Sequence, residues 1–252
     1  MRLDLYLVEN GYFDSRNKAK TAIDSNNVII NGKVINKGSY DVKDDDSIEI
    51  LGGQNPYVSR GGLKLEAAIK SFFIDMKGKT VLDIGASTGG FTDCALQHGA
   101  KKVYAVDVGT DQLHEKLLYD PRVISLEQTN IIDIDYFPEE IDLLVMDVSF
   151  VSIEYMLPNI IKHINENNAL VCLIKPQFEL GKTYMKNGIV KDRRLHIKVL
   201  ENVISECEKY NLGITKLITS PILGGSGNKE FLAYIKLNEK TKVNVLELFN
   251  KE

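Results

Sequence analysis

The spacing of hydrophobic and polar residues changes once along the chain. In the first part, apolar residues fall at helical spacing over Leu3–Val8 and again over Ala19–Ile23. The segment VIINGKVI then places Asn31-Gly32 between two β-branched runs, which is typical of a β-hairpin, and residues 47–51 alternate as in a strand. The pattern predicts a small α+β domain over residues 1–51.

A cluster of glycine, asparagine and proline follows and predicts a linker over residues 52–59. From residue 60 to 252 apolar strands alternate with helical segments, which predicts an α/β domain: a mostly parallel sheet with helices on both faces. The loop LGGSGN before the last strand is too short for a crossover, so that strand should run antiparallel to its neighbour. We expect strands at 80–85, 102–108, 123–127, 142–149, 169–176, 213–222 and 229–237, and helices near 61–73, 90–98, 110–118, 153–164 and 192–210.

Composition excludes several classes of protein. The longest run without a polar residue, Ala169–Ile174, is far shorter than the roughly 20 residues of a membrane span. Asp4, Glu9 and Asn10 interrupt what would be the apolar core of a secretory signal, so we expect a cytoplasmic protein. The three cysteines and four histidines lack the spacing of a metal site, and we expect no bound metal.

The formal net charge of −4 argues against a chain that coats nucleic acid, but charge is unevenly distributed. Residues 1–40 hold six basic and four acidic side chains, whereas residues 41–50 hold one basic and five acidic ones. This separation of charge is compatible with a local basic face on the first domain.

A glycine-rich turn follows the first strand of the second domain, in residues 83–91, DIGASTGGF. Glycines at this position let a ligand approach the backbone and the first amides of the next helix. Asp107, at the end of the second strand, is placed to bind a ribose diol. The spacing differs from G-x-G-x-x-G, which disfavours a nicotinamide or flavin cofactor. It resembles the D-x-G-x-x-x-G loop of S-adenosylmethionine-dependent methyltransferases; a turn without a ligand is the alternative.

Four ionisable side chains are expected near the ligand edge of this sheet. Asp147 and Lys175 follow the fourth and fifth strands, whose carboxyl ends border the ligand crevice in such folds. The apolar run before Lys175 shields its amine from water, and an adjacent aspartate could position it to take a proton from a hydroxyl. Taken singly, each residue is more readily explained as a solvated charge at a strand end, whereas four of them at these places are not expected by chance. The four residues are Lys64, Asp147, Lys175 and Glu230.

The chain resembles the TlyA family over nearly its whole length, through the segments YVSRGGLKL, DIGASTGGFTD, MDVSF, KPQFE and SPILGGSGNKEF. That family joins an N-terminal S4 RNA-binding domain to an FtsJ-like methyltransferase domain with a Rossmann-like fold. The fold has a seven-stranded, mostly parallel sheet. The resemblance implies S-adenosylmethionine as cofactor, ribosomal RNA or a ribosomal subunit as partner, and methylation of a cytidine ribose 2′-hydroxyl. In the S4 segment, Asn26-Asn27 stands where many members have a glycine.

The resemblance also implies roles for individual residues. The catalytic tetrad would be Lys64, Asp147, Lys175 and Glu230. Cofactor contacts would be Asp83, Gly85, Ala86, Ser87, Thr88, Gly89, Gly90, Phe91, Asp107 and Asn130. RNA contacts would be Arg2, Arg16, Lys18, Lys20 and Arg60, although basic residues on small helices are often simply solvated.

Two other hypotheses stay open at this point. Members of the family were also named haemolysins, and a membrane-lytic protein would need a long apolar or strongly amphipathic segment. An RNA-binding protein with an inactive methyltransferase fold is the second, and calorimetry with S-adenosylmethionine would separate it from an enzyme.

Overall fold

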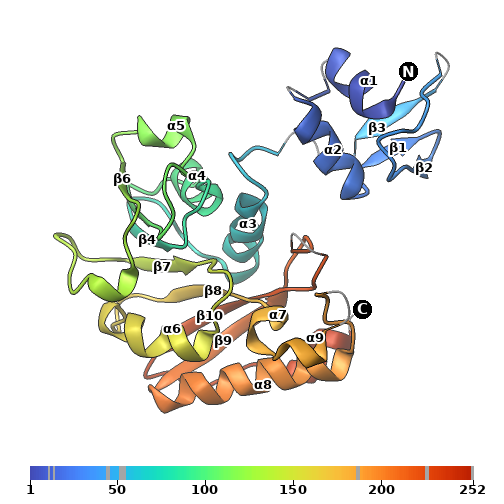
Figure 1. Cartoon of the computed structure of the whole chain (residues 1–252). Coiled ribbons are helices and arrows are strands. Elements are labelled where there is room, and N and C mark those ends of the chain that lie inside the picture. Colours follow the sequence, from blue (N-terminus) through green and yellow to red (C-terminus); the bar gives the residue numbers. More distant parts are fainter. Residues whose placement is uncertain are drawn as a thin grey trace. The chain divides into compact units, whose positions relative to one another are not determined.

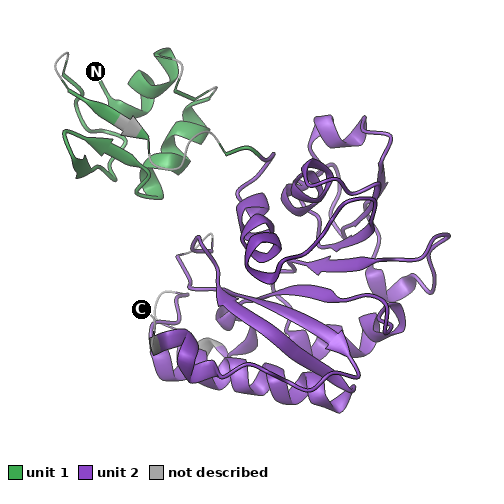
Figure 2. Cartoon of the chain, turned by 180° about the vertical axis from the view of Figure 1, so that it is seen from behind, with its two compact units in different colours: residues 1–56 green, residues 57–252 purple. Residues whose placement is uncertain are grey.

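The chain forms two compact units, residues 1–56 and 57–252, in a computed structural model (Figure 2). The structure describes residues 1–10, 12–13, 15–43, 46–50, 55–185, 188–224 and 227–250, without the side chains of Glu49, Lys182 and Asn250. We call the two parts the N-terminal unit and the C-terminal unit. The N-terminal unit has its own hydrophobic core, and two cores fill the C-terminal unit. Residues 52–54 of the predicted linker lie outside the described residues.

The N-terminal unit packs two helices on a small antiparallel sheet with the strand order β2-β1-β3. The Ser15 hydroxyl caps the second helix by accepting from the Lys18 amide. Asn31 and Gly32 form the hairpin turn with φ of 50° and 75°. Asn26 has a φ of 60°, which explains how asparagine replaces glycine here, because it tolerates the left-handed conformation. The elements are α1 (Leu3–Glu9), α2 (Arg16–Asp24), β1 (Val28–Ile30), β2 (Lys33–Val34) and β3 (Ile48–Ile50).

The C-terminal unit is built on a seven-stranded sheet with the order β6-β5-β4-β7-β8-β10-β9 (Figure 1). The first five strands in this order are parallel, and β10 is antiparallel to both of its neighbours. The predicted mostly parallel sheet with an antiparallel last strand is therefore confirmed. The strands are β4 (Thr80–Ile84), β5 (Lys102–Val106), β6 (Val123–Leu126), β7 (Leu143–Met146), β8 (Leu170–Ile174), β9 (Leu212–Thr219) and β10 (Phe231–Leu237).

Helices cover both faces of this sheet (Figure 1). One core joins the sheet to α3 (Gly61–Phe72), α4 (Gly90–Gln97) and α5 (Glu115–Leu118). The other joins it to α6 (Ile153–Ile160), α8 (Arg193–Lys209) and α9 (Val245–Asn250). Short elements complete the unit: α7 (Pro176–Glu179) and the 3-10 helices η1 (Ile131–Asp133), η2 (Ile161–His163) and η3 (Lys182–Tyr184).

The prediction of a helix over residues 110–118 is wrong for its first half, since α5 begins at Glu115. Asp111 has a left-handed φ of 52°. The amides of residues 111, 112 and 113 donate to the Glu127 carboxylate instead of entering a helix. A carboxylate that follows the neighbouring strand thus replaces the helical hydrogen bonds that the local pattern predicted.

Candidate active site

The turn after β4 depends on two glycines with left-handed backbone angles, Gly85 with φ 81° and Gly89 with φ 93°. A Cβ at Gly85 would lie 2.9 Å from the Asp147 carbonyl oxygen. A Cβ at Gly89 would lie 2.2 Å from the Leu117 side chain. Both positions are thus filled by neighbouring elements, and only glycine lets the turn pass between β7 and α5.

The first turns of α3 and α4 approach each other closely, because glycines lie at the contact. A Cβ at Gly90 would lie 2.9 Å from the Gly62 amide nitrogen, and one at Gly62 would lie 2.3 Å from the Tyr57 ring. This close approach places α3 against the helix that follows the glycine turn. Lys64, in the first turn of α3, is thereby brought to the carboxyl ends of the central strands.

Lys64, Asp147, Lys175 and Glu230 meet at that edge of the sheet. The Lys64 ammonium donates to Glu230 Oε2 at 2.7 Å and lies 3.7 Å from Asp147 Oδ2. The Lys175 ammonium lies 2.5 Å from Asp147 Oδ1 and donates to the Ser149 hydroxyl at 2.9 Å. Asp147 therefore lies between two lysines, each with a second oxygen partner.

These four residues form a buried cluster of balanced charge. Lys64, Lys175 and Glu230 are all less than a tenth exposed, and Asp147 is partly buried. Burying a charge is unfavourable unless it is paired and hydrogen-bonded, and each charge here has an opposite partner. Gln177 adds a hydrogen bond to Glu230 Oε1 at 3.1 Å. The cluster is therefore held in a fixed arrangement.

A cavity of about 290 Å³ lies beside this cluster. It joins Lys64, Asp147 and Lys175 to the glycine turn and to Arg60. Among the described residues its lining does not include Glu230, Asp83, Asp107 or Asn130. Sequence reasoning missed several lining residues, although the quoted motifs YVSRGGLKL, MDVSF and SPILGGSGNKEF contain them: Ser59, Gly61, Ser149, Ile222 and Leu223.

Asp107 and Asn130 hold the loops around the glycine turn. The Asp107 carboxylate accepts from the amides of Ser87 at 2.8 Å and Gly109 at 2.7 Å. The Thr129 amide donates to the Asp107 carbonyl oxygen, which brings Asn130 to the loop that follows β5. Asn130 is exposed and caps η1 through its side-chain oxygen. These contacts bring the ends of β4, β5 and β6 together.

Asp83, near the end of β4, is fully buried. Its Oδ2 accepts from the Thr92 hydroxyl at 2.6 Å, whereas Oδ1 has no hydrogen-bond partner among the described residues. Burial raises the pKa of this carboxyl to about 7, because no cation compensates the charge. Through its hydrogen bond with Thr92, in the first turn of α4, this carboxyl links the end of β4 to the helix that follows the glycine turn.

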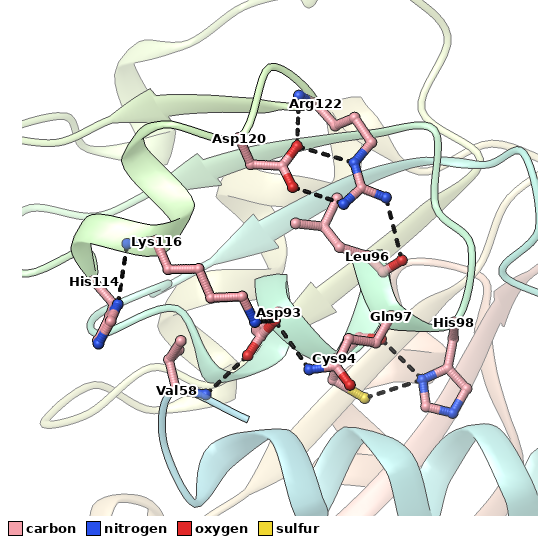
Figure 3. A network of polar contacts seen from close by, with 10 residues as sticks. All are labelled: Val58, Asp93, Cys94, Leu96, Gln97, His98, His114, Lys116, Asp120 and Arg122. Carbon is pink, nitrogen blue, oxygen red and sulfur yellow. Dashed lines mark hydrogen bonds and ion pairs between the residues drawn. The ribbon is translucent and has the colours of Figure 1, made fainter. Parts of the chain in front are cut away.

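Asp93 ties three segments together around α4, and sequence reasoning did not identify it (Figure 3). Its buried carboxylate accepts from the Val58 amide at 2.9 Å, the Gln97 amide group at 3.1 Å and the Lys116 ammonium at 3.0 Å. The segment before α3, the helix after the glycine turn and α5 thus share one acceptor. Asp93 lies in the quoted motif DIGASTGGFTD, but its contacts with Val58 and Lys116 are with segments distant in sequence.

The residues predicted to bind RNA fall in both units. Arg2 and Arg16 converge on the buried carboxylate of Asp4 in the N-terminal unit. Lys18 and Lys20 are exposed on α2. Arg60 instead lies in the C-terminal unit, where it is the N-cap residue before α3 and lines the cavity.

The described residues contain no candidate for a metal site or for a membrane-spanning helix. No three or more histidine, cysteine, aspartate or glutamate side chains in this part of the chain are placed to hold a metal ion. None of its helices has a stretch with the length and hydropathy that crossing a membrane requires.

Comparisons with known proteins identify both parts of the chain. The model described as FtsJ-like methyltransferase matches residues 57–237, and the S4 domain model matches residues 1–48. Hemolysin A of Brachyspira hyodysenteriae is 47% identical over 239 residues, which cover 93% of this chain and 99% of that protein. The 16S/23S rRNA (cytidine-2′-O)-methyltransferase TlyA of Mycobacterium tuberculosis is 36% identical over 241 residues, covering 93% and 89%.

A solved structure of a candidate hemolysin from Streptococcus thermophilus shares the fold, with 39% identity and a TM-score of 0.76. The match covers 100% of this chain and 97% of that one. The resemblance drawn from the sequence motifs is thus confirmed: the chain belongs to the TlyA family, in which an S4 domain precedes an FtsJ-like methyltransferase domain.

Proposed function

We propose that this protein transfers a methyl group from S-adenosylmethionine to a ribose 2′-hydroxyl of ribosomal RNA, at a cytidine. The observation that carries the proposal is the buried cluster of Lys64, Asp147, Lys175 and Glu230 beside the cavity at the glycine turn. The relative from Mycobacterium tuberculosis, whose name states this reaction, supports the nucleotide and the RNA class. We also infer that the protein acts in the cytoplasm, because its proposed substrate is ribosomal RNA.

The site has the features that S-adenosylmethionine requires. Gly85 and Gly89 give the turn its left-handed backbone angles, and Asp107 holds the Ser87 amide in that turn. We assign the cofactor to residues 83–91, Asp107 and Asn130, as the family motif implies. The bound cofactor supplies an electrophilic methyl group to the reaction.

Lys175 is the residue that we assign to the 2′-hydroxyl. Its ammonium is buried, is held by Asp147 and Ser149, and faces the cavity. There the ammonium can donate a hydrogen bond that orients the hydroxyl oxygen, and the amine formed by loss of one proton from this ammonium can accept the proton of the hydroxyl. Lys64 and Glu230 complete the frame of hydrogen bonds that fixes Asp147. Because methyl transfer needs an in-line approach, positioning by such a frame can supply roughly 7–11 kcal/mol of the barrier reduction.

The N-terminal unit supplies affinity for RNA in this proposal. We assign residues 1–51 to the S4 domain, 52–59 to the linker and 60–252 to the methyltransferase domain. Arg2, Arg16, Lys18 and Lys20 would contact phosphates in the first domain, and Arg60 at the cavity. Phosphate contacts of this kind make affinity fall as salt concentration rises.

The test compares ribose methylation of ribosomal RNA in cells with and without this gene, mapped by mass spectrometry. We expect one or more 2′-O-methylcytidines to disappear without the gene. Calorimetry with S-adenosylmethionine on the purified protein separates an inactive fold from an enzyme. Unchanged methylation together with lysis of lipid vesicles would instead favour the membrane-lytic reading of the haemolysin name.

A second experiment tests the division of labour between the units. A chain that lacks residues 1–51 should bind S-adenosylmethionine as the full chain does, because the C-terminal unit has separate hydrophobic cores. Its binding to ribosomal RNA should be weaker and less dependent on salt. Equal RNA affinity of the two chains would remove the S4 domain from substrate binding.

A further inference from the structure

We propose that Asp4 is a positioning residue that holds Arg2 and Arg16 as a clamp for one phosphate of the RNA backbone. The proposal rests on the RNA-binding role proposed above for the N-terminal unit. It adds a residue that carries the charge opposite to the one expected at an RNA-binding surface.

The geometry is that of one carboxylate shared by two guanidinium groups. Asp4 Oδ1 accepts from Arg2 Nε at 3.0 Å. Asp4 Oδ2 accepts from Arg2 Nη2 at 3.1 Å and from Arg16 Nε at 2.9 Å, with Arg16 Nη2 at 2.8 Å. Paired contacts of this kind fix the plane of each guanidinium group as well as its position.

Asp4 itself has little freedom to move. It is 3% exposed in the first turn of α1, and its amide donates to the Gly38 carbonyl oxygen at 3.1 Å. A Cβ at Gly38 would lie 3.3 Å from Asp4 Cβ, so the loop that contains Gly38 packs directly on the aspartate. The carboxylate is therefore a fixed acceptor that holds both arginines in place.

The arginines, in contrast, face outward. The side chains of Arg2 and Arg16 are 50% and 56% exposed, whereas that of Asp4 is 5% exposed. Each guanidinium group contacts Asp4 through Nε and Nη2, and among the described residues neither Nη1 has a contact. Two cations on one anion leave a surplus of one positive charge. A phosphodiester carries one negative charge and accepts such planar donors.

The physical benefit is that the arginines are ordered before RNA binds. Immobilising a long side chain at an interface is unfavourable, and here the cost is met during folding. A buried acid beneath two exposed arginines thus increases RNA affinity, although it lowers the positive charge of the surface.

The direction in which a substitution of Asp4 changes RNA affinity therefore tests the proposal. Asp4→Asn makes the protein more positive by one charge, and bulk electrostatics alone would tighten RNA binding. The clamp predicts the opposite: binding to purified ribosomal RNA should weaken about five- to tenfold as the two arginines lose their fixed positions. The matched control is Glu9→Gln, which removes an exposed acid from the same helix and should bind as tightly as the parent or more tightly.

All variants are full-length chains, measured by filter binding to ribosomal RNA, with thermal unfolding and S-adenosylmethionine binding recorded for each. A second variant avoids changing the buried residue. Arg2→Lys combined with Arg16→Lys keeps both charges, but it loses the planar fork and should weaken binding about fivefold. Adding Asp4→Asn to Arg2→Ala/Arg16→Ala should change RNA affinity little further, because the residues act as one unit.

The proposal is overturned if folded Asp4→Asn binds ribosomal RNA as tightly as Glu9→Gln, or if the double lysine variant binds like the parent. Failure of the proposed function gives a different result. In that case the parent chain shows no salt-dependent binding to ribosomal RNA and no methyl transfer, and both proposals fall together.

Discussion

The two units arrange charged side chains in opposite ways. In the N-terminal unit one buried acid, Asp4, holds two half-exposed arginines, so positive charge remains at the surface. In the C-terminal unit two lysines and two acids balance one another, mostly out of contact with water. The first arrangement attracts an anion from solution, whereas the second fixes donors and acceptors beside a cavity. The difference shows that surplus positive charge at the surface favours binding of an anion. Balanced, buried charges instead favour a fixed arrangement of side chains.

Two buried aspartates show the same contrast. The hydrogen bond from Arg2 lowers the pKa of Asp4 to about 2. Burial raises the pKa of Asp83 to about 7. Both carboxyls are almost inaccessible to solvent, so the cation beside Asp4 decides which of them stays ionised.

The largest expected disruption of the balanced cluster is Lys175→Ala. It removes the ammonium that Asp147 and Ser149 hold at the cavity, so methyl transfer should fall by about 10²–10⁴, the usual contribution of a positioned acid or base. Lys175→Arg should also fail, because a guanidinium group stays protonated and has a different shape. The measurement is transfer of tritiated methyl groups from S-adenosylmethionine to ribosomal RNA.

Cofactor affinity, measured separately by calorimetry, should survive in both Lys175 variants. Lys101→Ala, at an exposed lysine on the same unit, is the matched control and should transfer at the parental rate. Transfer by Lys175→Ala within a few-fold of the parent would shift the central role to Lys64 or to positioning alone.

Glu230→Gln tests how much stability depends on the balance of charge. Lys64 would keep only Asp147, at 3.7 Å, as an ion partner, and a buried cation without its closest anion is costly. We expect the free energy of unfolding to fall by about 3 kcal/mol, measured with urea. Lys64→Met combined with Glu230→Gln should recover part of this loss. If Glu230→Gln alone were as stable as the parent, the Lys64–Glu230 ion pair would contribute little to stability.

Asp107→Ala tests the loop that follows β5, which is linked to the turn after β4 through the Ser87 amide. The carboxylate binds the Ser87 and Gly109 amides, and it is the acid that we assign to the cofactor ribose. Charge-assisted hydrogen bonds are worth roughly 1.5–3 kcal/mol, so affinity for S-adenosylmethionine should fall about tenfold or more. Asp111→Asn, at an exposed acid of the same loop, should bind normally. Calorimetry that finds equal affinity for Asp107→Ala would remove it from the site.

Asp83→Asn should have the smallest effect, and one that depends on pH. The folded protein favours protonated Asp83, whose pKa of about 7 exceeds that of the unfolded chain. Its contribution to stability is therefore full below about pH 4 and is lost as pH rises toward 7. Asparagine does not ionise, so the stability of the variant relative to the parent should rise by about 1 kcal/mol between pH 6 and pH 7. Urea unfolding of the cofactor-free proteins checks this, and a difference independent of pH would contradict it.

The sequence predicted the fold well where local pattern and topology agree. Apolar runs located all seven strands of the large sheet, and the short LGGSGN loop correctly required an antiparallel last strand. The strands end earlier than predicted at some sites. β7 stops at Met146, and Phe150 then adopts a left-handed φ of 66°, because the chain turns to bring Asp147 and Ser149 beside Lys175.

What the sequence did not reveal are contacts between distant segments. Asp4 appears in the sequence as one more acid near the basic residues, yet the structure makes it their shared acceptor. Asp93 and Gln177 lie inside quoted motifs, but their partners come from other elements. A motif identifies which residue types occur together, whereas a hydrogen bond such as Gln177 to Glu230 depends on the pairing of β8 with β10, two strands that are not consecutive in the chain.

The position of β10 between β8 and β9 has a consequence for synthesis on the ribosome. β10 is made after both β8 and β9, yet it lies between them and pairs with both, and its first residue directly follows Glu230. Until residues 231–237 emerge, β8 and β9 expose unpaired edges and Lys64 lacks its closest anion. Such a late, non-local pairing slows folding and leaves the nascent sheet open to association with other chains. The cluster of Lys64, Asp147, Lys175 and Glu230 can therefore assemble only after the segment that holds Glu230 and β10 has been made.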